Sequence, residues 1–148
     1  MTIVVWDGSV LAADKQATTN DLVRKVTKIR RIRGNLVAVS GDWDRGQEVF
    51  DWYESGAEPE KMPAFQKTDD FVGLLVITPD KRILKYERSH VPMDFSEEDW
   101  FCMGSGRDYA YGALYMGATA PIAVMAASAF SSSCGHGVDI LTLEEVSE

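Results

Sequence analysis

The chain has few of the residues on which metal sites, disulfide frameworks and histidine-dependent active sites are built. Among its 148 residues are two cysteines, Cys102 and Cys134, which lie far apart and in no CxxC or Cys/His spacing. This pattern argues against a zinc site and structural disulfides, and it favours a reducing compartment. We therefore expect a cytoplasmic protein that binds no metal.

Histidine is equally scarce, since His90 and His136 are the only two in the chain. His136 follows Cys134 by two positions, and neighbours on one turn rarely face each other as nucleophile activation requires. The sequence also has no GxSxG, P-loop, HExxH or strand-linked GxGxxG motif. Serine–histidine catalysis, nucleotide binding and zinc-protease chemistry are therefore not expected.

Basic charge and long apolar runs are also lacking. The formal net charge is −8, so the surface repels a phosphate backbone and we expect no nucleic-acid binding. The opening residues, MTIVVWDG, contain no basic segment, so no signal peptide is expected. Residues 113–130 are rich in small apolar side chains, but Gly117, Thr119 and Pro121 interrupt them, which favours two short buried helices over a membrane span.

What is present is an ordinary globular composition, with 45% hydrophobic and 26% charged residues, which suits one domain over residues 1–148. Residues 2–6 and 9–13 are apolar and flank Asp7-Gly8, a strong hairpin signal. Residues 28–32 and 36–40 predict a second hairpin. Four strands are therefore expected before the first helix.

Helix signals follow. Asp42 or Asp44 can cap a helix that ends near residue 55, with Gly56 just beyond it. Further helices are expected over residues 107–116 and, with Thr119 as the cap, up to residue 130. The remaining expected elements are a loop at 58–70, a hairpin of 71–78 with 82–88, an irregular stretch at 90–99, and strands at 100–103 and 138–143. This order indicates an α+β protein with two packed sheets or one large sheet and helices outside.

A nucleophile that needs no histidine is available at the start of the chain. Removal of Met1 would give Thr2 a free α-amine beside its own hydroxyl. Such an amine has a pKa of about 7.7–8.0, so it can accept a proton near neutral pH. One residue would then supply both nucleophile and base.

Four stretches of the sequence, in order, resemble landmarks of proteasome β subunits and HslV, which are N-terminal nucleophile (Ntn) hydrolases. The first stretch contains Thr2-Ile3-Val4, Asp7-Gly8, the run from Val10 to Asp14, and Ala17-Thr18. The other three are residues 26–32, residues 37–42, and Gly104-Ser105-Gly106 with Tyr109-Ala110. They occur in the family's order and span the chain from residue 2 to residue 110.

The resemblance implies a role for each matching residue. Thr2 would be the nucleophile, Lys28 would lower the pKa of its hydroxyl and amine, and Asp14 would hold Lys28. Ser105 would help to relay the proton of the amine. A backbone N–H within residues 38–41, taken as that of Val39 or Gly41, would form the oxyanion hole.

Other interpretations of these residues stay open at this stage. Asp14 and Lys28 could form a surface ion pair, and residues 104–106 could be a plain turn. Ser131 and Cys134, which would support the site, stand where the family has an aspartate and a serine. The first hairpin is shorter than in the relatives by an even number of residues, which keeps the inward side chains facing inward.

The resemblance further implies a four-layer αββα sandwich and a threonine-type peptidase that needs no cofactor. A homo-oligomer, ring assembly, a peptide or unfolded-protein substrate and an ATPase unfoldase would follow. Trp43, Trp52 and Tyr53 could contact neighbouring copies or simply pack in the core. The alternatives are an inactive assembly protein, for which Ser131 argues, an Ntn amidohydrolase acting on a small amide, or a small binding domain without a catalytic site.

Overall fold

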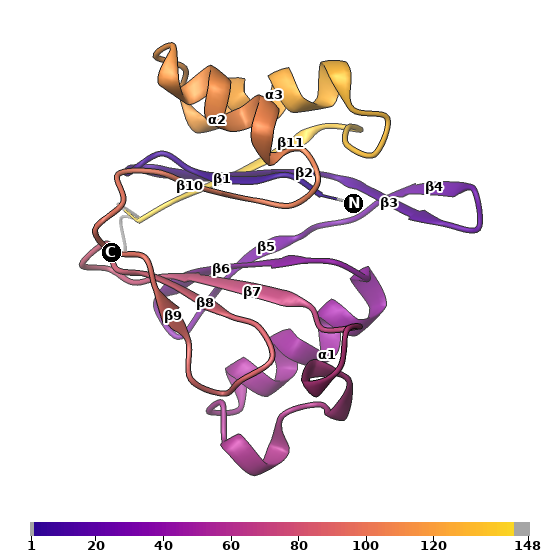
Figure 1. Ribbon diagram of the computed structural model, residues 1–148, viewed down its shortest axis with the longest axis vertical. Coiled ribbons are helices and arrows are strands. Elements are labelled where there is room, and N and C mark those ends of the chain that lie inside the picture. Colours follow the sequence, from indigo (N-terminus) through magenta and orange to yellow (C-terminus); the bar gives the residue numbers. More distant parts are fainter. Residues whose placement is uncertain (1, 144–148) are drawn as a thin grey trace, which may run out of the picture.

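The computed structural model describes residues 2–143, whose strands form two larger antiparallel sheets and one two-stranded ribbon (Figure 1). The first sheet has the order β10-β1-β2-β11 and contains Val4–Trp6 (β1), Val10–Asp14 (β2), Phe101–Met103 (β10) and Val138–Thr142 (β11). The second has the order β5-β6-β7-β8-β9 and contains Ile29–Ile32 (β5), Asn35–Ser40 (β6), Gly73–Ile77 (β7), Ile83–Tyr86 (β8) and Met93–Asp94 (β9). The expected mixed α+β class with antiparallel sheets is confirmed.

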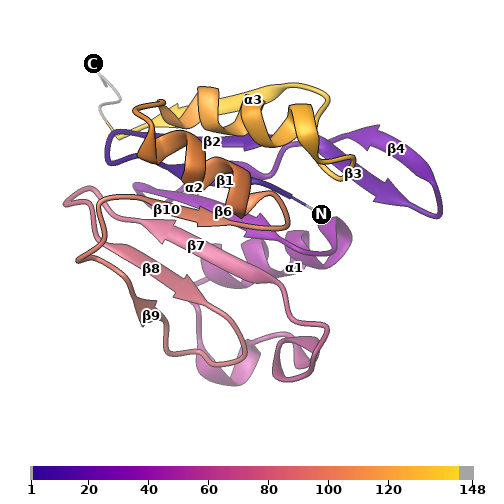
Figure 2. The same ribbon diagram turned by 45° about the horizontal axis from the view of Figure 1, so that its top comes forward.

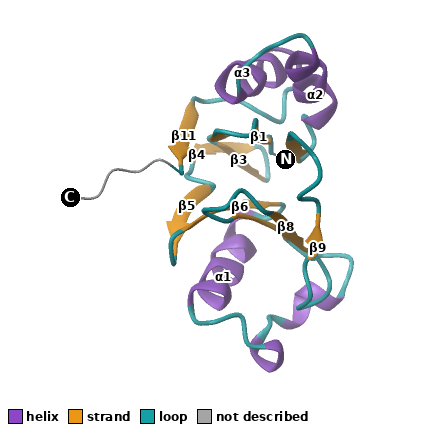
Figure 3. Ribbon diagram, turned by 90° about the vertical axis from the view of Figure 1, so that its left-hand side faces the viewer, coloured by secondary structure: helices purple, strands orange, loops and turns teal. Residues whose placement is uncertain are grey.

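The helices lie outside the two sheets. Figures 1 and 3 show Arg107–Tyr115 (α2) and Ala120–Phe130 (α3) over the first sheet, and Trp43–Glu54 (α1) over the second. Apolar side chains form three clusters: one between the sheets, one under α2 and α3, and one under α1. Each helix pairs an apolar face with the sheet beneath it, which is why both sheets are covered on two sides.

Strand β1 is buried on both of its faces. Val4 and Trp6 point into the cluster between the sheets, whereas Val5 and the preceding Ile3 point toward α2 and α3. This explains why the segment reads as a continuous apolar run rather than as an alternation. Since Thr2 directly precedes this segment, the chain holds Thr2 between two hydrophobic cores.

The Asp7-Gly8 turn joins β1 to β2 as predicted, and it also anchors a helix. Asp7 Oδ1 accepts the N–H groups of Ser9 and Val10, each at 2.8 Å. Its other oxygen accepts the N–H of Ala120 at 2.8 Å. The prediction that Thr119 caps α3 is therefore only half right, because Thr119 occupies the cap position but its side chain makes no capping bond. Asp7 supplies that bond from a distant part of the chain.

Helix α1 begins and ends where the sequence predicts. Asp42 accepts the N–H of Arg45 at 3.2 Å, and Gly56 has φ +119° after the last turn. The suggestion that its aromatics contact other copies is wrong for Trp52 and Tyr53. Both side chains are buried, at 5% and 8% exposure, in the cluster beneath α1.

The main departure from the predicted elements is the ribbon of Gln16–Thr19 (β3) and Leu22–Lys25 (β4), which the sequence does not signal. Residues 2–40 therefore contain six strands before α1, not four. Every residue of β4 is exposed, so no apolar alternation marks it, and Asn20 and Asp21 form its turn with positive φ angles of 49° and 69°. Figures 1 and 2 show the ribbon extending beyond the body of the molecule.

Smaller differences concern the connections. The expected loop at 58–70 contains two 3-10 turns, at Pro59–Lys61 and Ala64–Lys67, and the expected irregular stretch at 90–99 contains β9. No helix within residues 2–143 is both long and apolar enough to span a membrane. Residues 144–148, which follow the expected last strand, lie outside the described residues.

Candidate functional site

Thr2 is held at the edge of the first sheet by the turn that follows β10. The Gly106 N–H donates to the Thr2 carbonyl oxygen at 3.3 Å, and Thr2 is only 2% exposed. A Cβ on Gly104 would lie 2.1 Å from that same carbonyl oxygen, and Gly104 has φ +110°. Only glycine fits there, which gives a physical reason for the Gly-Ser-Gly stretch.

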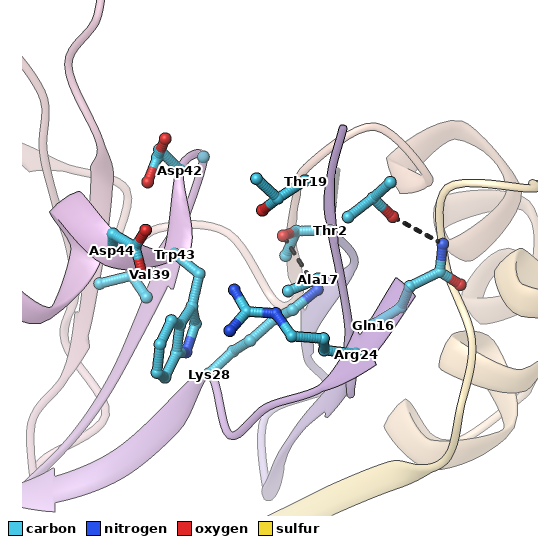
Figure 4. A pocket seen from close by; sticks show the side chains of 12 residues that line it. Thr2, Gln16, Ala17, Thr19, Arg24, Lys28, Val39, Asp42, Trp43 and Asp44 are labelled. Atoms are coloured by element: carbon cyan, nitrogen blue, oxygen red, sulfur yellow. Dashed lines mark hydrogen bonds between the residues drawn. The ribbon is translucent and has the colours of Figure 1, made fainter. Parts of the chain in front are cut away.

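Lys28 lies against the Thr2 side chain. Its Nζ donates to Thr2 Oγ1 at 3.1 Å and to Asp14 Oδ1 at 2.8 Å, and Figure 4 shows the Lys28–Thr2 contact as a dashed line. Lys28 is 3% exposed and Asp14 is fully buried. The alternative of a surface ion pair is therefore wrong, and the structure brings together all three residues.

The buried Asp14 carboxylate accepts hydrogen bonds at both of its oxygens. Besides the Lys28 ammonium, its carboxylate accepts the N–H groups of Ile3 at 3.1 Å, Gln16 at 3.3 Å and Gly135 at 3.0 Å. A buried carboxylate is tolerated only when it is both paired and hydrogen-bonded, and these donors meet that condition. Asp14 thereby links the start of β1, the ribbon and the segment after α3.

The electrostatic state of Lys28 follows from its burial. Removal from water lowers the pKa of the Lys28 ammonium, while the charge of Asp14 and the hydrogen bond to it work in the opposite direction. The ammonium is therefore held beside the hydroxyl but gives up a proton more readily than an exposed lysine. Hydrogen bonding to an oxygen that becomes negative favours the charged form of that oxygen.

Ser105 and Cys134 complete the surroundings of the Thr2 nitrogen. The Thr2 N–H donates to Ser105 Oγ at 3.3 Å, and the Cys134 thiol lies close to the side chains of Ser105 and Ser131. Burial and, next, the charge of Asp14 raise the pKa of Cys134, and the neighbouring hydroxyl groups of Ser131 and Ser105 only partly counter the rise. Cys134 is therefore a neutral thiol near neutral pH.

Ser131 is placed beside Cys134, and none of its hydrogen bonds within residues 2–143 reaches Thr2. Its Oγ accepts the N–H of Ser133 at 3.3 Å, and its carbonyl accepts the N–H of Cys134. A serine hydroxyl also carries no charge, so Ser131 cannot supply the negative field that an aspartate would supply.

A cleft opens beside Thr2, between the β3–β4 ribbon and the N-terminus of α1 (Figure 4). The Val39 N–H already donates to the Lys28 carbonyl at 3.1 Å, so it is not available to an oxyanion. The Gly41 N–H, in contrast, donates no hydrogen bond within residues 2–143. The residues that line this cleft are Thr2, Gln16, Ala17, Thr18, Thr19, Arg24, Lys28, Val39, Gly41, Asp42, Trp43 and Asp44.

Sequence reasoning missed three parts of this site. Gly135 reaches Asp14 from far along the chain, and no local signal marks that contact. Gln16 and Arg24 belong to the ribbon that was not foreseen. The turn signal at Asn20-Asp21 could have revealed the ribbon, and with it these two side chains.

Comparison with known proteins gives a match in structure only. No protein-family model matches the sequence, and no curated protein matches it. Thiobacillus denitrificans BPH superposes with a TM-score of 0.73 at 21% identity, covering 97% of this chain and 99% of that chain. BPH in complex with epoxomicin gives 0.72 at 20% identity, covering 98% and 100%. The chain therefore shares its fold with BPH over nearly its whole length.

Proposed function

We propose that this chain is a proteasome-like threonine hydrolase, in which Thr2 cleaves peptide bonds after Met1 is removed. The observation that carries the proposal is the 3.1 Å contact from the Lys28 ammonium to Thr2 Oγ1, with Lys28 fixed by a fully buried Asp14. A buried cation is costly unless it has a task or a partner, and here its second hydrogen bond points at a hydroxyl.

Removal of Met1 would convert the Thr2 nitrogen into the general base. In the first step Thr2 Oγ1 attacks the scissile carbonyl carbon, and the hydroxyl proton passes to the α-amine. The C–N bond then breaks, and the departing amine takes that proton. Water next adds to the carbonyl carbon of the resulting ester and gives one proton to the α-amine. The bond between that carbon and Oγ1 then breaks, and Oγ1 takes the proton back from the amine, which releases the acid and restores Thr2.

Lys28 and Ser105 support these steps at different atoms of Thr2, the hydroxyl oxygen and the nitrogen. The Lys28 ammonium favours the alkoxide form of Oγ1 and, through like charge, lowers the pKa of the nearby amine. Ser105 Oγ, at 3.3 Å from the Thr2 nitrogen, can orient the amine and pass a proton. The Cys134 thiol lies close to Ser105 and would help to position its hydroxyl.

The Gly41 N–H is our candidate for the oxyanion donor. It lines the cleft with Thr2 and makes no other hydrogen bond within residues 2–143. Gly41 has φ +125°, a conformation that side-chain-bearing residues rarely adopt. A donor fixed in this way can stabilise negative charge on the carbonyl oxygen during attack.

We further propose that residues 1–148 form one domain with the four-layer αββα sandwich of the Ntn hydrolases, and that it acts in the cytoplasm. Copies of the chain would associate through apolar side chains on the outer helices. The exposed side chains that support this proposal are Tyr109, Tyr115, Met116, Ile122, Met125 and Phe130. Ring assembly and an ATPase unfoldase partner belong to the same proposal.

The test combines intact mass with covalent labelling. The purified protein should lack the mass of one methionine, and epoxomicin, a peptide epoxyketone that reacts with a hydroxyl and a free amine, should add once to Thr2. Thr2→Ala and Lys28→Met should abolish the adduct, whereas Lys25→Gln, at an exposed residue that does not line the cleft, should leave it unchanged. An adduct that persists in Thr2→Ala would exclude Thr2 as the nucleophile.

A catalytically silent assembly protein is the second candidate, and Ser131 favours it. The uncharged Ser131 contacts Cys134 and leaves the Thr2 amine without a neighbouring carboxylate from that segment. Uniform retention of Met1 together with the absence of any epoxomicin adduct would support this function. If the adduct forms but no peptide is cleaved, an amidohydrolase acting on a small amide becomes the better assignment.

A further inference from the structure

Arg24 places a positively charged side chain in the wall of the cleft beside Thr2. The residue lies on β4, directly opposite Ala17 on β3, and both side chains line the cleft. Within residues 2–143, the Arg24 guanidinium donates no hydrogen bond and joins no ion pair. It lies 5.8 Å from the centre of the Trp43 ring, toward which it points in Figure 4.

The Trp43 ring gives this guanidinium a defined position. The indole Nε1 donates to the Thr27 carbonyl at 3.3 Å, which fixes the ring on the wall of the cleft. A guanidinium stacks on an aromatic face while its N–H groups stay free to bind a planar carboxylate in a two-point contact. Among the described residues, none accepts a hydrogen bond from these N–H groups, so they face the open side of the cleft.

Two carboxylates, those of Asp42 and Asp44, also line the cleft. Asp42 accepts the N–H of Arg45 as the N-cap of α1, and Asp44 lies in the first turn of that helix. Both therefore lie at the positive end of the α1 dipole, which offsets part of their negative charge. The Arg24 guanidinium donates no hydrogen bond within residues 2–143, so it is the group on this wall that a substrate anion would contact.

We propose that Arg24 makes this hydrolase prefer substrates with an acidic side chain on the residue whose carbonyl Thr2 attacks. The inference rests on the proposed peptidase function and adds the substrate class to it. The substrate carboxylate lies against the guanidinium over Trp43, and the scissile carbonyl lies between Thr2 and Gly41. The ribbon that carries Arg24 is thereby the specificity element of the site.

The test uses four peptides that differ only in having Glu, Gln, Leu or Lys at that residue. The parent protein should cleave the Glu peptide with a kcat/KM about five- to tenfold above that of the Gln peptide, as expected for a partly exposed charge-assisted pair. Arg24→Gln should remove the preference and Arg24→Glu should favour the Lys peptide. Lys25→Gln is the matched control, because Lys25 is adjacent on β4, carries the same charge and does not line the cleft.

Two readouts separate the inference from the function beneath it. Addition of epoxomicin to Thr2 in the parent protein and in Lys25→Gln reports that the site itself is intact, because Lys25 does not line the cleft. Binding of the Glu and Gln peptides to Thr2→Ala, measured by fluorescence anisotropy, reports selectivity without catalysis and should weaken with added salt. Equal binding of the two peptides, or a Glu preference that persists in Arg24→Gln, overturns the inference. If the parent protein itself forms no epoxomicin adduct, the proposed function is overturned.

Discussion

Replacing Asp14 by asparagine keeps the shape of the side chain but removes its charge and half of its acceptor capacity. Each carboxylate oxygen now serves two donors: Oδ1 accepts Lys28 Nζ and the Ile3 N–H, and Oδ2 accepts the N–H groups of Gln16 and Gly135. An amide offers one oxygen, so its NH2 group would face two donors whichever way it is turned.

The expected cost is a large part of the stability of a domain of this size. Removing one partner of a buried ion pair destabilises by about 3–5 kcal/mol, because the other charge stays buried without compensation. Lys28→Met should cost less, about 1–3 kcal/mol, because the Asp14 carboxylate keeps three backbone donors. The double variant removes the uncompensated ammonium, so its cost should fall clearly below the sum of the two single costs.

Urea unfolding followed by tryptophan fluorescence gives the free energy of unfolding for each variant. Glu58→Gln is the control, because its ion pair with Lys61 is exposed and should contribute less than about 1 kcal/mol. If Asp14→Asn costs no more than this control, or if the two single costs simply add, the ion pair does not hold this part of the fold and the reasoning fails.

Three further predictions concern stability. Gly104→Ala should cost about 3 kcal/mol or more, since its Cβ would lie 2.1 Å from the Thr2 carbonyl oxygen. Gly34→Ala, also at positive φ but with free space around it, should cost only about 1–2 kcal/mol, and equal losses in urea unfolding would contradict the close approach at Gly104. Burial raises the pKa of Cys102 from 9.0 to about 12. The thiol of the unfolded chain therefore ionises first, so the free energy of unfolding should fall as the pH rises from 9 toward 12. If the thermal unfolding midpoint of the parent is no more sensitive to pH than that of Cys102→Ala, this prediction is refuted. Asp7→Ala should lower the free energy of unfolding by about 1–2 kcal/mol by uncapping α3, and an unchanged urea midpoint would show that water replaces the cap.

The sequence predicts well those elements whose signals are local. The Asp7-Gly8 turn, the Asp42 cap and the Gly56 stop each act within a few residues, so the first hairpin and α1 lie where expected. The β3–β4 ribbon was missed because its exposed residues carry no apolar alternation. The sequence predicts Thr119 as the cap of α3, but the side chain that accepts the N–H of Ala120 is Asp7, which comes close to α3 only in the folded chain.

The candidate site divides in the same way. The resemblance named Thr2, Asp14 and Lys28, but their distances depend on how the two sheets pack, and only the structure gives them. The resemblance also left two backbone N–H groups as candidates, those of Val39 and Gly41. In the structure the Val39 N–H donates to the Lys28 carbonyl, whereas the Gly41 N–H donates no hydrogen bond within residues 2–143. A backbone N–H carries no sequence signature, so its availability can be read only from coordinates.

The carboxylate of Asp14 joins groups that leave the ribosome at very different times. Its four donors come from positions 3, 16, 28 and 135, so the last of them is synthesised long after the other three. A growing chain that lacks the segment around Gly135 would hold Asp14, and through it Lys28, with one donor fewer. The anchoring of Lys28 beside Thr2 would thus be completed late, after residue 135 has been made.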